Sequence, residues 1–212
     1  ASCLVGSEMC IRDRKNILVL SIINTALPFS LFAYASLESS SNMLSILNGT
    51  TAIMAVVIST IWLKIRLNFF QIMGVFIGLF GIVVLANPDN VYISMKATIF
   101  CLSAAFCYAL SANYIQKFAY KTNTIVLIGW SLVIASVLLL PITFFNLPSQ
   151  FPSNNVIFSI LWLGVISTGV AFLGYVRLIE KVGAVKTATV AYFIPVFLSL
   201  IHISEPTRQL AI

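Results

Sequence analysis

Several uncharged polar side chains interrupt the long apolar stretches of this chain, and they are its best candidates for contact with a small polar ligand. Asn48 is the sharpest of them, because it lies with Thr50 and Thr51 midway along an apolar run, where an amide has no water unless a cavity supplies it. The alternative for each residue is a hydrogen bond that holds neighbouring helices together. The candidate binding residues are Asn24, Thr25, Tyr34, Asn48, Thr51, Tyr108, Asn113, Thr168 and Tyr192.

Few residues of the kinds needed for catalysis or metal binding lie in the middle of the apolar runs. Glu38, Asp89 and Glu180 all lie close to loops, so a proton relay through a buried carboxylate has no support. Hydrolysis within a membrane needs a serine with a histidine base, paired aspartates or a metal site. Cys101 and Cys107 are six residues apart, which suits neither a metal pair nor a disulfide. The sequence therefore predicts no catalytic residue, no metal site and no cofactor.

The elements that position these residues are apolar runs of membrane-spanning length. Hydrophobic residues make up 60% of the chain and charged residues only 8%, whereas a soluble domain carries about 25% charged residues. A helix that crosses the bilayer needs about 20 mostly apolar residues, and only helices or closed barrels satisfy their backbone in lipid. We therefore expect an all-α polytopic membrane bundle of about seven spans. The runs are Ile17–Leu37, Met43–Leu63, Phe69–Ala86, Ala97–Phe118, Thr124–Phe145, Val156–Val176 and Ala184 onward.

The basic residues predict how these spans are oriented. The net charge of +6 does not indicate nucleic acid, because the basic residues sit singly between apolar runs instead of clustering on one element. One side of the predicted topology holds Lys15, Lys64, Arg66, Lys117, Lys121, Arg177, Lys181 and Lys186. The other side holds Glu38, Asp89 and the single Lys96. Basic loops stay in the cytoplasm, so the first span should begin inside. A seven-helix receptor, the alternative that the span count suggests, would begin outside.

Both ends of the chain are expected to be foreign to the gene. Leu4–Arg14 and Leu198–Arg208 resemble translations of a sequencing-library transposon adapter, one from each strand. The peptide IRDR can be written ATA AGA GAC AG, and its reverse complement, CTG TCT CTT AT, encodes Leu-Ser-Leu and the start of Ile, as the second stretch begins. We therefore assign residues 1–14 and 198–212 to adapter sequence and expect the remainder to be an internal fragment.

Two apolar segments also resemble each other. NTALPFSLF (Asn24–Phe32) aligns without a gap to STGVAFLGY (Ser167–Tyr175), and the alignment pairs Thr25 with Thr168. Five crossings separate the copies, and because five is odd, the second copy should be upside down relative to the first. Inverted repeats of this kind are typical of secondary transporters, although coincidence between two apolar helices is the alternative.

The stretches Asn24–Pro88 and Ser167–Phe197 resemble the two copies of the EamA domain found in the drug/metabolite transporter superfamily. The resemblance implies a ten-helix protein of two inverted five-helix repeats, with residues 15–90 as the latter part of the first repeat and 91–197 as the first four spans of the second. It further implies a multi-pass transporter of small metabolites, such as amino acids, in the bacterial cytoplasmic membrane, with a small-molecule substrate and the bilayer as partners. A membrane protein without transport activity is the remaining alternative.

The resemblance has one departure, and other features of the spans predict packing. The family often has proline in the fourth span, and Pro195 fits this pattern in the ninth, but the first copy carries Thr51 and Ala52 there. The acidic residue that commonly follows the fourth span is also missing, because the loop reads KIRLN. Gly74 and Gly78 have the GxxxG spacing that lets helices approach closely, so we expect a structural role for them.

Overall fold

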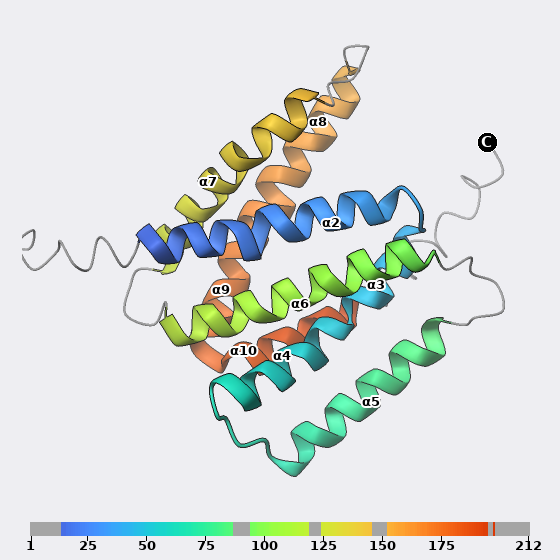
Figure 1. Ribbon diagram of the computed structural model, residues 1–212, viewed down its shortest axis with the longest axis vertical. Coiled ribbons are helices and arrows are strands. Elements are labelled where there is room, and N and C mark those ends of the chain that lie inside the picture. Colours follow the sequence, from blue (N-terminus) through green and yellow to red (C-terminus); the bar gives the residue numbers. More distant parts are fainter. Residues whose placement is uncertain (1–13, 87–93, 119–123, 146–151, 195–196, 198–212) are drawn as a thin grey trace, which may run out of the picture. The chain divides into compact units, whose positions relative to one another are not determined.

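The computed structural model describes residues 14–86, 94–118, 124–145, 152–194 and 197, and these residues form helices without any strand (Figure 1). Five helical stretches are long and apolar enough to cross a membrane, and they coincide with five of the predicted spans. These stretches are Arg14–Ser36, Met43–Trp62, Met95–Phe118, Val126–Phe145 and Asn154–Val182. The predicted fold class, an all-α polytopic bundle, is confirmed.

The other two predicted spans are not among these five stretches, although α5 (Phe69–Ala86) has the same bounds as the predicted run. Helix α5 has 18 residues, or about 27 Å at 1.5 Å per residue, close to the thickness of the hydrocarbon layer. The last predicted span begins as α10 (Ala184–Ala188) and continues as the 3₁₀-helix η4 (Thr189–Tyr192). Pro195 and the terminal segments 1–13 and 198–212 lie outside the described residues.

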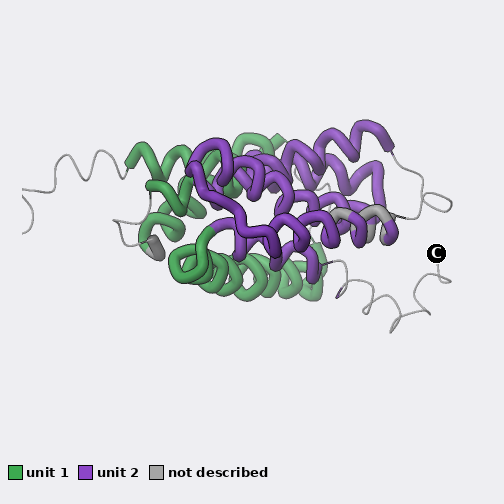
Figure 2. The backbone as a smooth tube through the Cα atoms, turned by 90° about the horizontal axis from the view of Figure 1, so that it is seen from below, with its two compact units in different colours: residues 1–26, 114–183 green, residues 27–113, 184–212 purple. Residues whose placement is uncertain are grey.

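The chain divides into two compact units (Figure 2). Unit 1 contains residues 1–26 and 114–183, and unit 2 contains residues 27–113 and 184–212. Each unit therefore draws on both of the predicted repeats, 15–90 and 91–197.

Unit 1 is built around helix α7. The π-helix η1 (Ser21–Ala26) packs along α7 (Thr124–Phe145), and α9 (Ala171–Val182) packs on α7 as well. α7 buries Leu127, Ile128, Ser131 and Ala135, which share one face of a helix. α8 (Asn154–Trp162) and the π-helix η3 (Leu163–Val170) lead into α9 and expose large apolar side chains. Exposed apolar surface of this kind suits lipid as the surrounding medium.

Unit 2 packs its helices through small side chains. It contains α2 (Leu27–Ser36), α3 (Ser41–Asn48), α4 (Thr50–Trp62), α5, most of α6 (Met95–Phe118), α10 and η4. One core cluster consists of Ala52, Ala55, Ala109 and Ala188, and a second of Ala35, Ala97 and Cys101. Small residues at these positions let helix backbones approach closely, as expected of helices that associate in lipid.

Local sequence explains where the helices begin, end and widen. The Ser40 side chain accepts a hydrogen bond from the Met43 N–H at 3.4 Å and so caps α3. Gly183 has a φ of 88°, a backbone conformation that favours glycine, and its N–H donates to the Ile179 carbonyl at the end of α9. Pro28 has no N–H for the Asn24 carbonyl, and its ring would crowd that oxygen, which accounts for the π-helical turn just before it.

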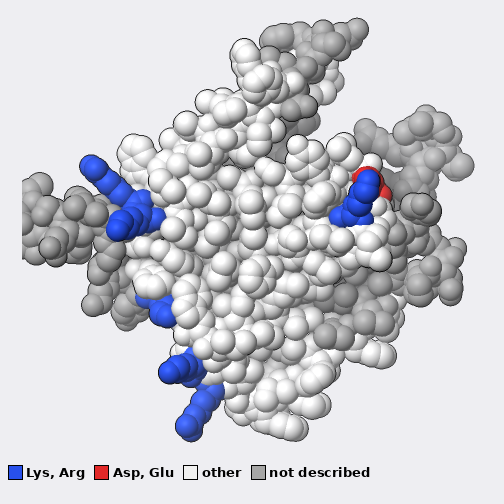
Figure 3. Space-filling view, viewed as in Figure 1, with Lys and Arg blue, Asp and Glu red and all other residues white. Residues whose placement is uncertain are grey.

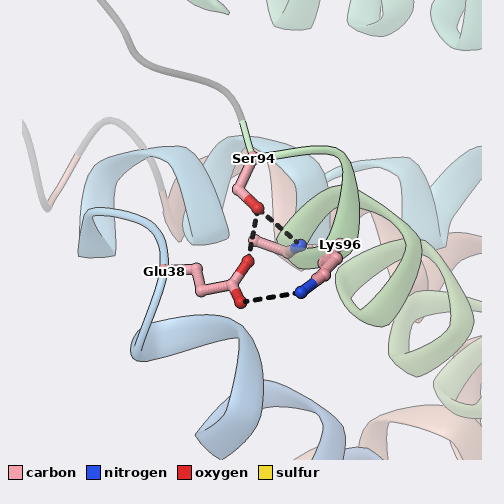
Figure 4. Close-up of polar contacts among 4 residues, drawn as sticks. Glu38, Ser94 and Lys96 are labelled. Carbon is pink, nitrogen blue, oxygen red and sulfur yellow. Dashed lines mark hydrogen bonds and ion pairs between the residues drawn. The ribbon is translucent and has the colours of Figure 1, made fainter.

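The charged side chains of unit 2 lie at opposite ends of its helices. Figure 3 shows the few charged side chains in small groups with uncharged surface around them. The Glu38 carboxylate accepts a hydrogen bond of 2.5 Å from the Ser94 hydroxyl and pairs with Lys96 at 3.9 Å (Figure 4). Glu38 lies just before α3, whereas Lys64 follows α4, and the intervening 20-residue stretch Met43–Trp62 spans about 30 Å. This separation agrees with the predicted sorting of charge.

Candidate functional site

The Tyr192 ring lies where four elements of unit 2 meet. It packs on the cluster formed by Ala52, Ala55, Ala109 and Ala188, which come from α4, α6 and α10. The side chain also fills the space beside Gly78 of α5, where a Cβ would come within 2.6 Å of the Tyr192 Cζ atom. The Tyr192 Oη atom is buried and has no hydrogen-bond partner among the described residues. A buried hydroxyl in this state can bind a ligand polar group without losing an existing bond.

Gly78 therefore makes a close contact, although it is not the helix–helix approach that the GxxxG spacing predicts. A Cβ at Gly74 or Gly81 would meet no atom of the described residues within 4 Å, so the close approach is specific to Gly78. The contact partner is an aromatic ring rather than the backbone of a second helix.

Asn48 is the last residue of α3, and only Gly49, which has a helical φ of −57° and ψ of −25°, separates it from α4. The Gly49 N–H donates to the carbonyls of Ser45 and Ile46, and the Thr50 hydroxyl donates to the Leu47 carbonyl at 2.6 Å. The half-buried Asn48 side chain accepts a hydrogen bond of 3.1 Å from the buried Thr51 hydroxyl through its Oδ1 atom. Asn48 and Thr51 are therefore linked to each other one turn apart. The side-chain N–H groups of Asn48 form no hydrogen bond within the described part of the chain.

Asn113 holds two helices of unit 2 together. Its Nδ2 atom donates to the carbonyls of Ala109, at 2.8 Å, and Ala55, at 3.2 Å, and its Oδ1 atom accepts from the Ser59 hydroxyl. The side chain is fully buried, and both donors and its acceptor oxygen are engaged by α4 and α6. This geometry favours the helix-holding alternative for Asn113 over ligand contact.

Tyr34 and Tyr108, the other two candidate tyrosines of unit 2, differ in exposure. The half-buried Tyr108 stacks with Phe32, with ring centroids 6.0 Å apart. Tyr34 is 53% exposed and lies beside Phe100 at a centroid distance of 6.3 Å. Tyr34 is thus the candidate with the most exposed side chain.

The remaining candidates, all in unit 1, lie in its two π-helical turns. Asn24 and Thr25 are buried in η1, and the Thr25 Oγ1 atom has no hydrogen-bond partner among the described residues. Thr168 is half-buried in η3, and its hydroxyl donates to the Leu163 carbonyl five residues earlier, at 3.1 Å. In the alignment of the two similar segments, Thr25 pairs with Thr168, so each copy carries a threonine within a π-helical turn.

Sequence reasoning missed Ser59, the partner of the candidate Asn113, and it missed the pair formed by Asn16 and Tyr114. Ser59 lies on the buried face of α4 with Ala52, Ala55 and Val56. These positions recur at intervals of three or four residues, and this helical spacing could have predicted that Ser59 is buried. The Tyr114 hydroxyl donates to the Asn16 Oδ1 atom at 2.7 Å. These two residues are 98 positions apart in sequence, and no local pattern predicts the pairing.

The buried polar side chains of the described residues are all uncharged. Within the same part of the chain there is no group of three or more His, Cys, Asp or Glu residues able to hold a metal, and Cys101 and Cys107 are free thiols buried in α6. The described interior therefore offers hydroxyls and amides to a ligand, without a counter-ion.

Comparisons with known proteins extend the sequence resemblance. The family model described as the EamA-like transporter family matches residues 7–87 and 95–203. An uncharacterized transporter of Archaeoglobus fulgidus is 24% identical over 195 residues, which cover 91% of this chain and 69% of the relative. The uncharacterized transporter YoaV of Bacillus subtilis is 26% identical, covering 86% and 64%. An uncharacterized transporter of Acidianus ambivalens is 26% identical, covering 85% and 70%. The chain thus spans about two thirds of the length of these relatives.

A solved crystal structure has the same fold. It superposes with a TM-score of 0.72 over 89% of this chain and 67% of that chain, at 17% sequence identity. A likeness at this identity concerns the fold alone.

Proposed function

Because the chain belongs to the EamA-like transporter family, we propose that it carries small metabolites, such as amino acids or related compounds, across the bacterial cytoplasmic membrane. The proposed mechanism is alternating access between two inverted repeats. In such transporters the solute binds near the middle of the membrane, and irregular helix segments expose backbone or side-chain polar groups to it.

The observation that carries the proposal is the pair of π-helical turns at matching places in the two similar segments. η1 ends at Ala26 and η3 ends at Val170, within one residue of the same alignment position. π-helical turns are rare, and they occur frequently at functional sites because they widen the helix and redirect its side chains. Pro28 accounts for the π-helical turn in the first segment, but the second segment has no proline. The two turns therefore do not arise from the same local sequence feature.

The buried hydroxyls of Thr25 in unit 1 and of Tyr192 in unit 2 are two separate candidates for solute contact, each argued within its own unit. Each is buried without a hydrogen-bond partner among the described residues, a state that costs about 1–3 kcal/mol per group. A solute that bonds to such a hydroxyl recovers this cost. Because the buried polar groups of the described residues are uncharged, the proposed solute is neutral or zwitterionic. Asn113 has its bonds within the protein, and its proposed role is to hold α4 against α6.

The test is solute flux in liposomes. The complete protein is reconstituted, radiolabelled amino acids and other small metabolites are screened, and the transported solute is then measured with two matched variants. Thr25→Val removes the buried hydroxyl while keeping the side-chain shape. Thr143→Val removes an exposed hydroxyl of α7 that bonds to the Leu139 carbonyl.

We expect Thr25→Val to raise the KM about tenfold, corresponding to the loss of about 1.4 kcal/mol of binding. Its stability should be unchanged or slightly higher, because an unpaired buried hydroxyl has been removed. Thr143→Val should keep the KM of the unaltered protein. Absence of flux for every solute contradicts the transport proposal, and an equal KM in both variants contradicts the role of Thr25.

A further inference from the structure

A hollow of about 560 Å³ lies where the chain turns from α4 into α5. It is lined by Thr60, Lys64, Ile65, Arg66, Leu67 and Ile72. All of these residues belong to unit 2 and to one continuous stretch of chain, so the hollow is formed by a single turn between two consecutive helices. None of them is among the proposed solute contacts.

The backbone of this turn is tied to the end of α4. The N–H groups of Leu63 and Ile65 both donate to the Ser59 carbonyl, at 3.0 Å and 3.4 Å. Lys64 between them has a φ of 53°, which is uncommon for a residue with a side chain and makes the turn tight. The backbone on both sides of Lys64 is therefore fixed to the end of α4, and Arg66 follows directly after Ile65.

The hollow combines positive charge with an apolar wall. Lys64 and Arg66 are exposed, and neither forms an ion pair with an acidic residue in the described part of the chain. By contrast, Lys96, in the first turn of α6, is paired with Glu38. Ile65, Leu67 and Ile72 supply apolar surface beside the two cations.

The position of the hollow along the spans matches a membrane–water boundary. The apolar stretch Met43–Trp62 ends two residues before Lys64, and α5 begins at Phe69. Tryptophan is enriched at this boundary in membrane proteins, and Trp62 lies there. By the distribution of basic residues, this boundary belongs to the cytoplasmic leaflet, where anionic lipids create a negative surface potential.

We propose that this hollow binds an anionic phospholipid, with the phosphate at Lys64 and Arg66 and the start of the acyl chains along Ile65, Leu67 and Ile72. Two unneutralised cations favour a lipid with net negative charge over a zwitterionic one. The apolar wall favours a lipid over free phosphate, which would gain nothing from that surface. The site is separate from the proposed solute contacts and does not depend on transport.

The test is native mass spectrometry of the purified chain in detergent, titrated with phosphatidylglycerol, with phosphatidylcholine or with inorganic phosphate. The variant Lys64→Gln/Arg66→Gln removes both cations of the hollow. The matched control Arg177→Gln/Lys181→Gln removes one lysine and one arginine from the last turns of α9, in unit 1.

We expect phosphatidylglycerol to bind at least tenfold more tightly than phosphatidylcholine to the unaltered chain. The hollow variant should lose roughly thirtyfold in affinity for phosphatidylglycerol, from about 1 kcal/mol for each cation, while the control changes by less than about threefold. Equal losses in the two variants overturn the proposal in favour of diffuse attraction. Displacement of the lipid by an equal concentration of inorganic phosphate overturns it in favour of a free-anion site.

A second measurement needs no substitution. A photoactivatable phosphatidylglycerol in the unaltered chain should crosslink within residues 60–72, as mapped by peptide mass spectrometry. Crosslinks confined to other segments overturn the proposal even if the double variant fails to fold.

Discussion

A single methyl group added at Gly78 should destabilise the protein, because Tyr192 occupies the space that this group needs. In Gly78→Ala the new Cβ would lie 2.6 Å from the Tyr192 Cζ atom, 2.8 Å from Cε2 and 2.9 Å from Oη. Real Cβ contacts are longer than 3.0 Å, so the ring must shift against the alanine cluster on which it packs. Overpacking of this kind costs about 1–3 kcal/mol.

Gly74→Ala in the same helix is the matched control. A Cβ at Gly74 meets no atom of the described residues within 4 Å, and both substitutions gain the same helix propensity, about 1 kcal/mol. The propensity gain therefore cancels when the two variants are compared. We expect Gly78→Ala to be less stable than Gly74→Ala by about 1–3 kcal/mol.

The assay is reversible denaturant unfolding in detergent micelles, followed by tryptophan fluorescence. Adding Tyr192→Ala to each glycine variant completes a double-mutant cycle. The Gly78→Ala and Tyr192→Ala substitutions should couple by about 1–3 kcal/mol, because Tyr192→Ala removes the ring with which the new methyl group clashes. Equal stability of the two alanine variants, or strictly additive effects with Tyr192→Ala, would refute the reasoning.

Four further outcomes follow from the same geometry. Asn113→Leu should lower the free energy of unfolding in detergent by about 1–2 kcal/mol, because its hydrogen bonds between α4 and α6 are lost. The KM for the transported solute should be unchanged, and a raised KM at normal stability contradicts the helix-holding role. Gly183→Ala should cost about 1 kcal/mol or more in the same unfolding assay because its φ of 88° strains an alanine, and no loss of stability contradicts this. Glu38→Gln should change the melting temperature little, since an exposed ion pair contributes less than about 1 kcal/mol, and a large decrease contradicts this. Tyr192→Phe should keep the stability of the protein and raise the KM in liposomes about tenfold, and an unchanged KM removes Tyr192 from the proposed contacts.

The spans could be predicted from the sequence because the thickness of the bilayer fixes the length of an apolar run. The five long helical stretches agree with predicted runs to within a few residues at most ends, and their charged residues lie in the first or last turns. The close contact at Gly78 also had a local signal in the GxxxG spacing, although its partner is a tyrosine ring.

The environment of each candidate residue could not be predicted in this way. Asn113 and Tyr192 both read as polar groups at depth, yet the first has its hydrogen bonds within the protein and the second has none among the described residues. The difference arises from which residues of α4, α5 and α10 face them, and these elements are distant in sequence. The π-helical turn of η3 contains no proline, so no local pattern in the sequence marks it.

The central claim is that the segments around Thr25 and Thr168 cross the membrane in opposite directions, which requires the topology inferred from the charges. The most direct measurement is the accessibility of single cysteines to a membrane-impermeant maleimide in oriented vesicles, after the four cysteines of the chain have been replaced by alanine. Cysteines at positions 64, 117 and 181 should react only from the cytoplasmic side, and cysteines at positions 38 and 96 only from the opposite side. Labelling of positions 64 and 117 from opposite sides would contradict the inverted arrangement and the transport mechanism built on it.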